Sequence, residues 1–530
     1  MAQAQLLEGQ SGLPVDNPTK SYWHKEPSSK LLGHRTTKEL PRSADVVIVG
    51  SGITGSFAAH FLKEKQPDLN VVMVEAREAC SGATGRNGGH CQPAIYSSNP
   101  HIASFELRNF LYLKGLVEEF SIPCDWRSTS GVHTFYSKEL FETCRHIVDN
   151  LTEDYPDLAA NVAVVTKGKQ GEGDLSGSPA YLLEGERREL TLGGLRIPHA
   201  EGAIVQWNAA SLWPYKLVAF LLERLLAANE GGSKGSFNLQ TNTPVTGLSR
   251  AETSANLSSP GNSKTRKHNS IWTVHTPRGT IVTSQVLLAT NGYTSHLLPQ
   301  FSDLLVPTRG QISALKPPET PTDPADPPLD IGHTYYVVGE PVDPYSRDDY
   351  LVQRPPPAAE LIFGGGRQHA AGRGIGVWDD SGIDESVSWY LRGELSNAID
   401  LSLHHTQFSG GKVSLRKLDL EPTFEWSGIM GYTRDSHPWV GGVPASLGGG
   451  SGLWLCAGYT GHGMPNAVLS AKAVVDMLLA DDDDDDVEID LPPEYELTER
   501  RVNHVREGWE DVAVADAKGS LYMDFGPQRW

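Results

Sequence analysis

A glycine-rich segment near the start of the chain has the residue types and spacing that hold a dinucleotide. It directly follows the apolar, β-branched run 45–49, and its pattern is GxGxxG. The first glycine of such a pattern permits a tight turn, the second lets the backbone approach a pyrophosphate, and the third lets a helix pack closely on a strand. The N-terminus of the helix that follows offers free N–H groups and a partial positive charge to phosphates. The three glycines are Gly50, Gly52 and Gly55.

A carboxylate stands where the ribose of the nucleotide is expected. Glu75 closes a second apolar run, 70–75, and follows Gly50 by 25 residues. An acid at about this distance accepts hydrogen bonds from the adenosine ribose, and its charge disfavours the 2′-phosphate of NADP. A glycine-rich turn alone is common, but here the strand, the helix and the acid occur together and in order. The combination predicts that the chain binds a dinucleotide, either NAD or FAD.

The elements that position these residues form one βαβ unit. The run 45–49 predicts a buried parallel strand, Ile53–Lys65 predicts a helix, and 70–75 predicts a second strand. Residues 1–43 are polar and lack a sustained period, so we expect an arm lying on the surface. Further predicted elements are helices at 211–229, with Ser211 as N-cap, 466–479 and 494–508, and strands at 271–275 and 281–289.

Composition limits the class of protein. The 530 residues suffice for two or three domains or one two-lobed enzyme, and the 39% of hydrophobic residues excludes wholesale disorder. The net charge of −20 argues against nucleic-acid binding, because phosphate contacts need a basic face. No apolar run reaches the roughly 18 residues of a membrane span, and no signal peptide is recognised. Five cysteines without a CxxC pair predict neither disulfides nor zinc and favour a cytoplasmic location.

Several segments are predicted to take no part in chemistry. The stretches 166–178, 251–270 and 316–328 are too polar or too rich in proline to bury a core, so we expect surface insertions. The GxSxG pattern at 231–235 follows a helix rather than a strand, so it is not a nucleophile elbow. The run Asp481–Asp486 lacks the glycine and terminal glutamate of a calcium loop. It predicts a solvated linker, and no metal site is predicted.

A loop of small residues distinguishes FAD from NAD. Residues 81–89 read SGATGRNGG, which favours a loop pressed against a ligand, whereas a plain NAD domain more often continues into a helix. With VVIVGSGITG before this loop and ATNGY and GYTGHG after it, the sequence resembles the FAD-dependent oxidoreductases of the D-amino-acid oxidase superfamily. Within it, the sequence is most similar to the branch of glycine oxidase, sarcosine oxidase and γ-glutamylputrescine oxidase. The motifs keep the family's order over residues 44–480.

The resemblance implies an α/β flavoprotein with two lobes. One is a Rossmann-type FAD-binding lobe of the glutathione-reductase kind, and the other is a substrate lobe with an antiparallel sheet and helices. The expected FAD-binding segments are 44–125, 200–305 and 415–480, and the expected substrate segments are 126–199 and 306–414. The remaining segments are an N-terminal arm, 1–43, and an acidic linker with a C-terminal tail, 481–530.

The resemblance also assigns residues to FAD. It implies that the glycine turn holds the pyrophosphate, that Glu75 and Arg77 lie at the adenosine, and that 81–89 follow the ribityl chain to the flavin. Residues 458–464 would close the isoalloxazine end. The implied cofactor-binding residues are Gly50, Ser51, Gly52, Thr54, Gly55, Glu75, Arg77, Ser81, Gly82, Ala83, Thr84, Arg86, Asn87, Gly88, Gly89, Val245, Asn291, Gly431, Asp435, Gly458, Gly461, His462, Gly463 and Met464.

The activity that the resemblance implies is oxidation of a C–N bond. A hydride would pass from the carbon beside the nitrogen of an amine or amino acid to FAD, and the imine would hydrolyse to a carbonyl compound. O₂ would take the electrons and give H₂O₂. The alternatives are a tailoring flavoprotein oxidoreductase of specialised metabolism and a FAD-binding accessory protein without amine oxidase activity.

Three residues are candidates for catalysis, each with a simpler alternative. His90 follows the loop 81–89 and is suited to proton transfer or to packing on the flavin. His462 is suited to chemistry or to fixing the turn in which it lies. Arg309 begins a segment that enters the substrate lobe, and it would clamp a carboxylate or make a surface ion pair.

Two departures from the family's pattern bear on cofactor and substrate. Sarcosine-oxidase relatives tether the flavin through a cysteine where this chain has Met430 and Gly431, so we expect FAD to be held without a covalent bond. Those relatives also hold small carboxylates with a lysine where this chain has Pro465. Because an unpaired carboxylate is costly to desolvate, we expect a substrate larger than sarcosine or with its charge elsewhere.

Overall fold

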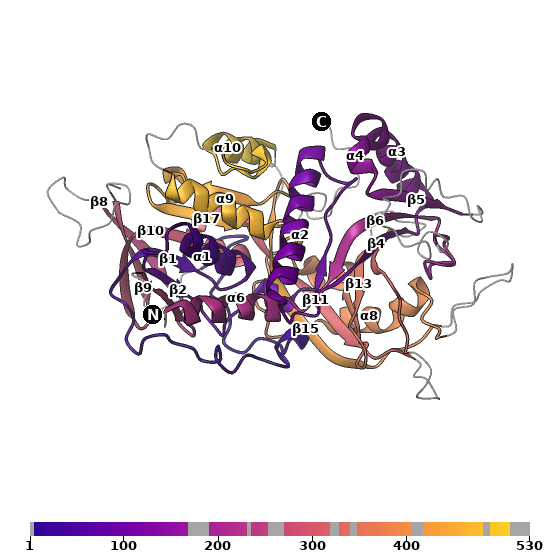
Figure 1. Ribbon diagram of the computed structural model, residues 1–530, viewed down its shortest axis with the longest axis horizontal. Helices are drawn as coiled ribbons and strands as arrows, with labels where there is room; N and C mark the ends of the chain where they lie inside the picture. The colour runs from indigo at the N-terminus through magenta and orange to yellow at the C-terminus, as the bar shows by residue number, and fades with distance from the viewer. Residues whose placement is uncertain are drawn as a thin grey trace.

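The fold is built on two β-sheets that lie side by side (Figure 1). The computed structural model describes residues 5–167, 190–229, 235–252, 270–318, 328–339, 347–403, 417–480 and 488–508. We call the sheet around the predicted βαβ unit sheet A and the other sheet B. The predicted surface insertions, the GxSxG pattern and the acidic run lie mostly or wholly outside the described residues.

Sheet A is mostly parallel. Its strands are β1 (Ser43–Val49), β2 (Val71–Val74), β7 (Phe237–Gln240), β8 (Gly247–Glu252), β9 (Ser270–Thr276), β10 (Gly279–Leu288), β16 (Trp439–Gly442) and β17 (Leu453–Ala457). They follow the order β16-β17-β10-β1-β2-β7, and β9 joins β8 to β10. Strand β1 runs parallel to β2 and β10, as the predicted βαβ unit requires. The Val-, Ile- and Leu-rich runs suit strands that are covered on both faces.

Sheet B is mixed and mainly antiparallel. Its strands are β3 (His90–Cys91), β4 (Arg127–Phe135), β5 (Val162–Thr166), β6 (Gly202–Ser211), β11 (Leu305–Leu315), β12 (Thr334–Val338), β13 (Asp348–Gln353), β14 (Leu361–Gly365) and β15 (Pro422–Thr433). The order is β15-β11-β14-β13-β12-β4-β6-β3, with β5 beside β6. Only the pair of β4 and β12 is parallel among the described strands of this sheet. The α/β fold with two lobes is therefore confirmed.

Three strands of sheet B fall inside segments that were predicted for the FAD-binding lobe, and the first is the short β3, in 44–125, which pairs with β6. Strand β6 pairs with β4, although it begins the segment 200–305. Strand β15 pairs with β11 along its whole length, although it lies in 415–480. The chain passes from sheet B to sheet A after Ser211 and after Thr433, at the ends of long strands rather than in a linker.

The helices cover sheet A, cover sheet B or lie between them. The helices are α1 (Ile53–Lys65), α2 (Pro100–Phe120), α3 (Lys138–Asp154), α4 (Pro156–Ala159), α6 (Pro214–Ala228), α7 (Thr294–Leu297), α8 (Glu385–Ala398), α9 (Ala467–Leu479) and α10 (Glu499–Gly508). Helix α1 packs against α6 and α9 over sheet A. Figure 1 shows α2 running along the junction of the two sheets. Among the described residues, no helix combines the length and the apolar character that crossing a membrane requires.

Two predicted helices begin later than the sequence suggested. The helix predicted from Ser211 begins at Pro214, because Ser211 is the last residue of β6 and proline suits the first helical turn. The helix predicted at 494–508 begins at Glu499, because Pro493–Tyr495 form a separate 3₁₀ turn. In both cases a proline inside the predicted range begins a new element, so the helix starts later than predicted.

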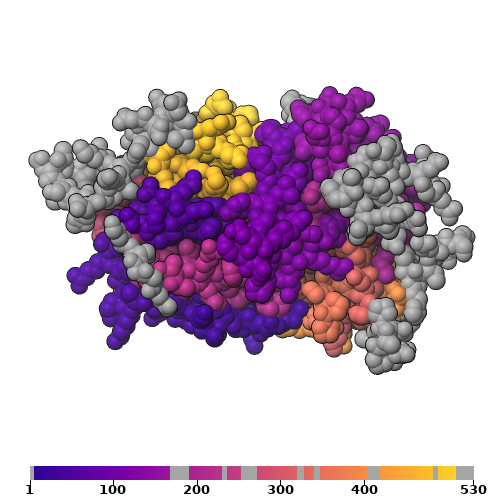
Figure 2. Space-filling model, in the orientation of Figure 1, coloured from indigo at the N-terminus to yellow at the C-terminus, as the bar shows by residue number. Residues whose placement is uncertain are grey.

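The N-terminal arm lies along the surface, as was predicted, but a few of its residues are buried and fix it there. Tyr22 and Trp23 are buried almost completely. The Trp23 indole donates to the carbonyl oxygen of Asn87, and Trp213 donates to the carbonyl oxygen of Trp23 at 2.7 Å. Figure 2 shows the indigo arm running along the lower edge of the molecule. The two aromatic side chains supply enough apolar area to fix the arm, which its polar composition concealed.

Candidate functional site

One cavity runs from the glycine turn of sheet A to side chains of sheet B. Its volume is about 340 Å³, and both sheets contribute to its wall. The carboxyl ends of β1, β2 and β10 open into it through Val49, Val74 and Ala289. Because ligands of open α/β sheets bind outside the carboxyl ends of the strands, a nucleotide is expected here.

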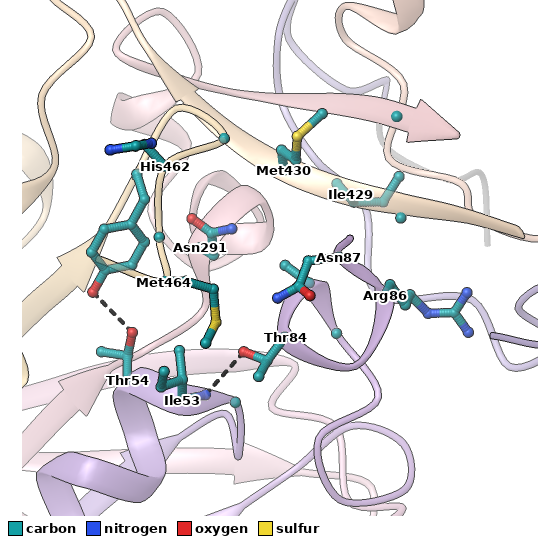
Figure 3. Close-up of a pocket in the computed structure, with 18 of the residues that line it drawn as sticks. Ile53, Thr54, Thr84, Arg86, Asn87, Asn291, Ile429, Met430, His462 and Met464 are labelled. Carbon is teal, nitrogen blue, oxygen red and sulfur yellow. Dashed lines mark hydrogen bonds between the residues drawn. The ribbon is translucent and has the colours of Figure 1, made fainter. Parts of the chain in front are cut away.

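The glycine turn brings backbone to the cavity wall with no room for side chains. Gly50 has a φ of +106°, which side chains rarely adopt, and a Cβ there would lie 2.6 Å from the carbonyl oxygen of Ala289. A Cβ on Gly55 would lie 2.0 Å from the carbonyl oxygen of Gly50. Helix α1 therefore starts against the turn, and the N–H of Ile53 donates to Thr84 Oγ1 at 3.0 Å (Figure 3).

Glu75 is held in one orientation at the end of β2. Its Oε2 accepts from the backbone N–H and the hydroxyl of Ser51, at 3.0 and 2.7 Å, and its Oε1 accepts from the N–H of Arg77 at 3.0 Å. The carboxylate is 9% exposed and lines the cavity. These three hydrogen bonds fix the glycine turn and the loop after β2 to the same carboxylate.

Two buried arginines share one buried aspartate beside the loop 81–89. Arg77 donates through Nη1 to both oxygens of Asp380, at 2.9 and 3.1 Å, and Arg86 Nε lies 3.3 Å from Asp380 Oδ2. Arg86 also donates to Thr19 of the arm and to the carbonyl oxygen of Ser427 on β15. Burial, opposed by Asp380, lowers the pKa of the Arg86 guanidinium to about 10. This cluster ties the arm, sheet A and sheet B together.

An in-register row of side chains across sheet B forms the opposite wall. His133 on β4 pairs with Tyr336 on β12, Tyr336 pairs with Tyr350 on β13, and Tyr350 pairs with Gly364 on β14. A Cβ on Gly364 would lie 2.4 Å from the Tyr350 side chain, and a Cβ on Gly88 would lie 2.3 Å from it. The loop 81–89 therefore touches this wall directly, so a ligand along the loop reaches the tyrosines.

The polar groups of this wall are neutral or paired. Burial, with the charges of neighbouring histidines, lowers the pKa of His133 to about 3 and that of His90 to about 4. Arg367 donates through Nε and Nη2 to Asp348 Oδ2, at 3.2 and 2.7 Å. The guanidinium also lies 5.0 Å from the ring centre of Tyr432. This arginine is therefore held by a carboxylate of the chain itself.

The turn 458–464 closes the end of the cavity beside helix α2. His462 Nε2 bonds to Glu106 Oε2 at 3.0 Å, and the Tyr459 and Thr54 hydroxyls bond to each other at 2.8 Å. Figure 3 shows His462 and Met464 projecting from this turn. The turn is thereby linked both to α1 and to α2.

Most residues that the sequence assigned to cofactor or catalysis meet in this one cavity. They come from segments far apart in the chain: the glycine turn, the loop after β2, the residues after β7 and β10, and the turn before α9. Those that line the cavity are Gly50, Ser51, Gly52, Thr54, Glu75, Arg77, Gly82, Ala83, Thr84, Arg86, Asn87, Gly88, His90, Val245, Asn291, Gly461, His462, Gly463 and Met464.

Two assigned residues with charged side chains lie elsewhere. Arg309 donates to the carbonyl oxygen of Asp379 at 3.4 Å, while its neighbours Gly310 and Gln311 line the cavity instead. Arg309 is thus not among the lining residues, and its role as a carboxylate clamp stays a prediction. Asp435 accepts both branches of the Arg501 guanidinium, at 2.8 and 3.1 Å, and so fixes α10.

The other assigned residues outside the lining support the wall from behind. The carbonyl oxygen of Ser81 accepts from both Arg77 and Arg86, at 2.9 Å each. The N–H of Gly458 donates to Asn291 Oδ1 at 3.0 Å, which fixes that amide at the cavity. Three assigned glycines also lie outside the lining, namely Gly55, Gly89 and Gly431. At each of them an added Cβ would come too close to neighbouring atoms.

Several lining residues were not predicted from the sequence. Leu13 and Pro14 come from the arm, whose composition gave no sign of a site. His133 and Tyr336 stand in ordinary strand sequences, so only the pairing of β4 with β12 brings them together. Tyr293 belongs to the ATNGY string that was recognised, and this string was a usable signal.

Residues 45–477 match the protein family described as FAD dependent oxidoreductase. The chain belongs to this family. Comparison with curated proteins finds no match to the sequence. FAD is the cofactor of this flavoprotein, as the resemblance implied.

Solved structures share the fold of this flavoprotein at low sequence identity. Glycine oxidase from Geobacillus kaustophilus is 17% identical, with a TM-score of 0.59 over 86% of this chain and 99% of the other. L-amino acid deaminase from Proteus vulgaris is also 17% identical, with a TM-score of 0.56 over 89% and 99%. Iminodiacetate oxidase from Chelativorans sp. BNC1 is 15% identical, with a TM-score of 0.55 over 86% and 99%.

The residues of the cavity fit FAD. The turn at Gly50 and Gly52 leaves space that side chains would fill, and Glu75 presents a fixed carboxylate. The buried Tyr293 hydroxyl and His296 Nε2 belong to lining residues and have no partner in the described part of the chain. Nowhere in that part do three His, Cys, Asp or Glu side chains gather as a metal ion would need.

Proposed function

We propose that this flavoprotein oxidises a C–N bond of an amine to an imine, with O₂ as the final electron acceptor. The carbon beside the nitrogen loses a hydride, the nitrogen loses a proton, water hydrolyses the imine to a carbonyl compound, and O₂ becomes H₂O₂. Bound FAD supplies the acceptor for the hydride. The observation that carries the proposal is the single cavity that joins the glycine turn to the tyrosine wall of sheet B.

In this proposal the lining residues of sheet A hold and orient FAD. The turn at Gly50–Gly52, with its backbone N–H groups and the start of α1, would hold the pyrophosphate. Glu75 would accept from the ribose hydroxyls, and the loop 81–89 would hold the flavin on the side of Tyr350. The turn 458–464 closes the flavin end, and the helix α9 that follows it adds a partial positive charge.

The charges around the cavity favour an amine without a free carboxylate next to the nitrogen. In the described part of the wall, the cationic side chains are already paired: Arg77 and Arg86 with Asp380, and Arg367 with Asp348. Pro465, which stands where the relatives have a lysine, and Met430 line the cavity and carry no charge. A carboxylate moved there from water would lose its solvation, and a further basic side chain of the described lining, His462, is already paired with Glu106.

The neutral wall also favours the reactive form of the amine. An ammonium group is disfavoured where burial keeps even His90 and His133 uncharged. The substrate nitrogen is therefore bound with its lone pair free, which loss of a hydride from the neighbouring carbon requires. The tyrosines offer faces for an apolar or aromatic substituent.

A paired panel of amines tests the proposal. Each secondary or primary amine is offered with and without a carboxylate on the carbon beside the nitrogen, for example N-methylbenzylamine with N-methylphenylglycine. We expect the amine without the carboxylate to bleach the visible flavin band anaerobically and to yield H₂O₂ in air. A panel in which no amine bleaches the flavin contradicts amine oxidation.

Two further outcomes separate the parts of the proposal. Bleaching without H₂O₂ in air would retain amine oxidation but exclude O₂ as the acceptor. Efficient turnover of sarcosine or glycine would contradict the substrate class. The variant Asp348→Asn removes the partner of Arg367, so we expect it to shift the preference towards carboxylated amines, whereas Asp490→Asn, at an exposed ion pair with Arg108, should not.

A further inference from the structure

A histidine at the flavin end of the cavity is paired with a buried glutamate that the sequence did not single out. His462 lines the cavity, and about a quarter of its side chain is exposed. Its Nε2 lies 3.0 Å from Oε2 of Glu106, a residue of α2 whose side chain is 3% exposed. Among the described residues, His462 Nδ1 has no hydrogen-bond partner, so this nitrogen remains available to a ligand.

Every other contact of the Glu106 carboxylate suits its ionised form. Oε2 also accepts from the backbone N–H of Ala94 at 2.6 Å, and Oε1 accepts from the Asn466 amide at 2.8 Å. An ionised carboxylate only accepts, and here it faces three donors. Asn109, one turn further along α2, donates to the carbonyl oxygen of Met464 and accepts from the N–H groups that begin α9. Helix α2 therefore fixes both the charge and the position of the turn.

We propose that Glu106 holds His462 as an imidazolium at the flavin end of the cavity, and that this fixed positive charge supports flavin reduction. Glu106 is then a positioning residue, because it acts through His462. The inference rests on the proposed function only for what the charge does during turnover. The charge itself is defined by the pair and is measurable without a substrate.

The other histidines near His462 are held neutral, so His462 is the histidine of this region that can carry a charge. Burial and the charge of His462 hold His90 on β3 and His133 on β4 neutral. On the far side of Glu106 stand His437 and Tyr495, and burial favours the neutral form of both. Burial would also lower the pKa of His462, but the charge and the hydrogen bond of Glu106 outweigh it and raise that pKa above its usual value.

The location gives the charge a chemical use. Negative charge develops on the flavin when it accepts a hydride, and a fixed cation nearby stabilises that charge without reorganising. The partial charge at the start of α9 acts in the same direction. Met464 and Pro465, which follow in the turn, carry no charge, so His462 is the residue of this turn that supplies a full one.

Sulfite binding and histidine NMR test the pair in the FAD-loaded protein. Sulfite adds to oxidised flavin most tightly where a positive charge stabilises the adduct, and its affinity reports that charge without any turnover. We expect Glu106→Gln and His462→Asn each to weaken sulfite binding at neutral pH by about tenfold or more, the scale of losing one unit charge nearby. The double variant should lose little more than either single one, because both changes remove the same charge.

The pH dependence gives a second, independent readout. Glu106 raises the pKa of His462, so sulfite affinity, corrected for sulfite's own ionisation, should fall as pH rises through that raised pKa. In Glu106→Gln the fall in sulfite affinity should occur at lower pH. The ¹⁵N signal of His462, which is identified by its absence from the His462→Asn spectrum, should also titrate at lower pH in Glu106→Gln. Glu494→Gln is the matched control, because Glu494, in the 3₁₀ turn Pro493–Tyr495, forms a partly exposed ion pair with His101 of α2.

Three outcomes would overturn the inference. One is a Glu106→Gln protein with the sulfite affinity and the His462 titration of the wild type. The second is a His462→Asn protein that folds, retains FAD and binds sulfite unchanged. The third is an effect of Glu494→Gln equal to that of Glu106→Gln. If Glu106→Gln does not fold, His462→Asn alone decides the question, because Glu106 keeps its other two donors there.

Discussion

Asp380 is the single carboxylate on which two buried guanidinium groups converge. The change Asp380→Asn keeps the shape of this side chain and removes its charge. Asp380 is fully buried, and the side chains of Arg77 and Arg86 are less than a tenth exposed. Removing one partner of a buried ion pair costs about 3–5 kcal/mol, because the remaining charge is left uncompensated. Here two charges lose their partner, but backbone carbonyl oxygens still accept from both arginines.

We therefore expect Asp380→Asn to lower the free energy of unfolding by about 3–5 kcal/mol. Urea unfolding of the FAD-loaded protein, followed by tryptophan fluorescence and far-UV circular dichroism, measures this as a lower midpoint at an unchanged slope. The control Asp490→Asn breaks the exposed pair with Arg108 and should cost less than about 1 kcal/mol. A loss of less than 1 kcal/mol for Asp380→Asn would refute the view that this cluster holds arm, loop and sheet B together.

Three other predictions concern the cofactor. Glu75→Ala should release FAD on dialysis without changing the far-UV circular dichroism spectrum, because it removes the ribose acceptor and the hydrogen-bond partner of Ser51. FAD occupancy equal to that of the wild type would show that Glu75 does not bind the ribose. Gly55→Ala should give apoprotein, because its Cβ would meet the carbonyl oxygen of Gly50 at 2.0 Å; a yellow, FAD-loaded protein would contradict this contact. Acid precipitation of the wild type should leave a colourless pellet, because Met430 offers no covalent link; a yellow pellet would disprove it.

The local parts of the fold were predictable because their signals are contiguous. The βαβ unit depends on hydrophobic period, a glycine turn and an acid that all lie within 45–75, and α1 has the predicted bounds Ile53–Lys65. The family's motif order extended this to the two lobes. Most of the residues that it assigned meet in the cavity, because the motifs mark loops at the ends of strands.

The remaining parts of the site depend on contacts between distant segments. Glu106 is one of 65 acidic residues and stands in an ordinary helix, and its partner His462 is 356 residues away. The burial of Tyr22 and Trp23 follows from partners on α6 and the loop 81–89, which no local period reveals. His133 and Tyr336 become neighbours only through the parallel pairing of β4 with β12.

The path of the N-terminal arm has a consequence for how cofactor enters and leaves. Leu13 and Pro14 form part of the cavity wall, and Thr19 is bonded to Asp380 and Ser427, more than 350 residues further along the chain. These partners come together only when the rest of the chain has folded, so we expect the arm to dock after it. FAD that enters before docking is enclosed by it. We therefore expect exchange of bound for free FAD to be limited by detachment of the arm, and uptake by apoprotein to show a fast binding phase followed by a slower closing phase.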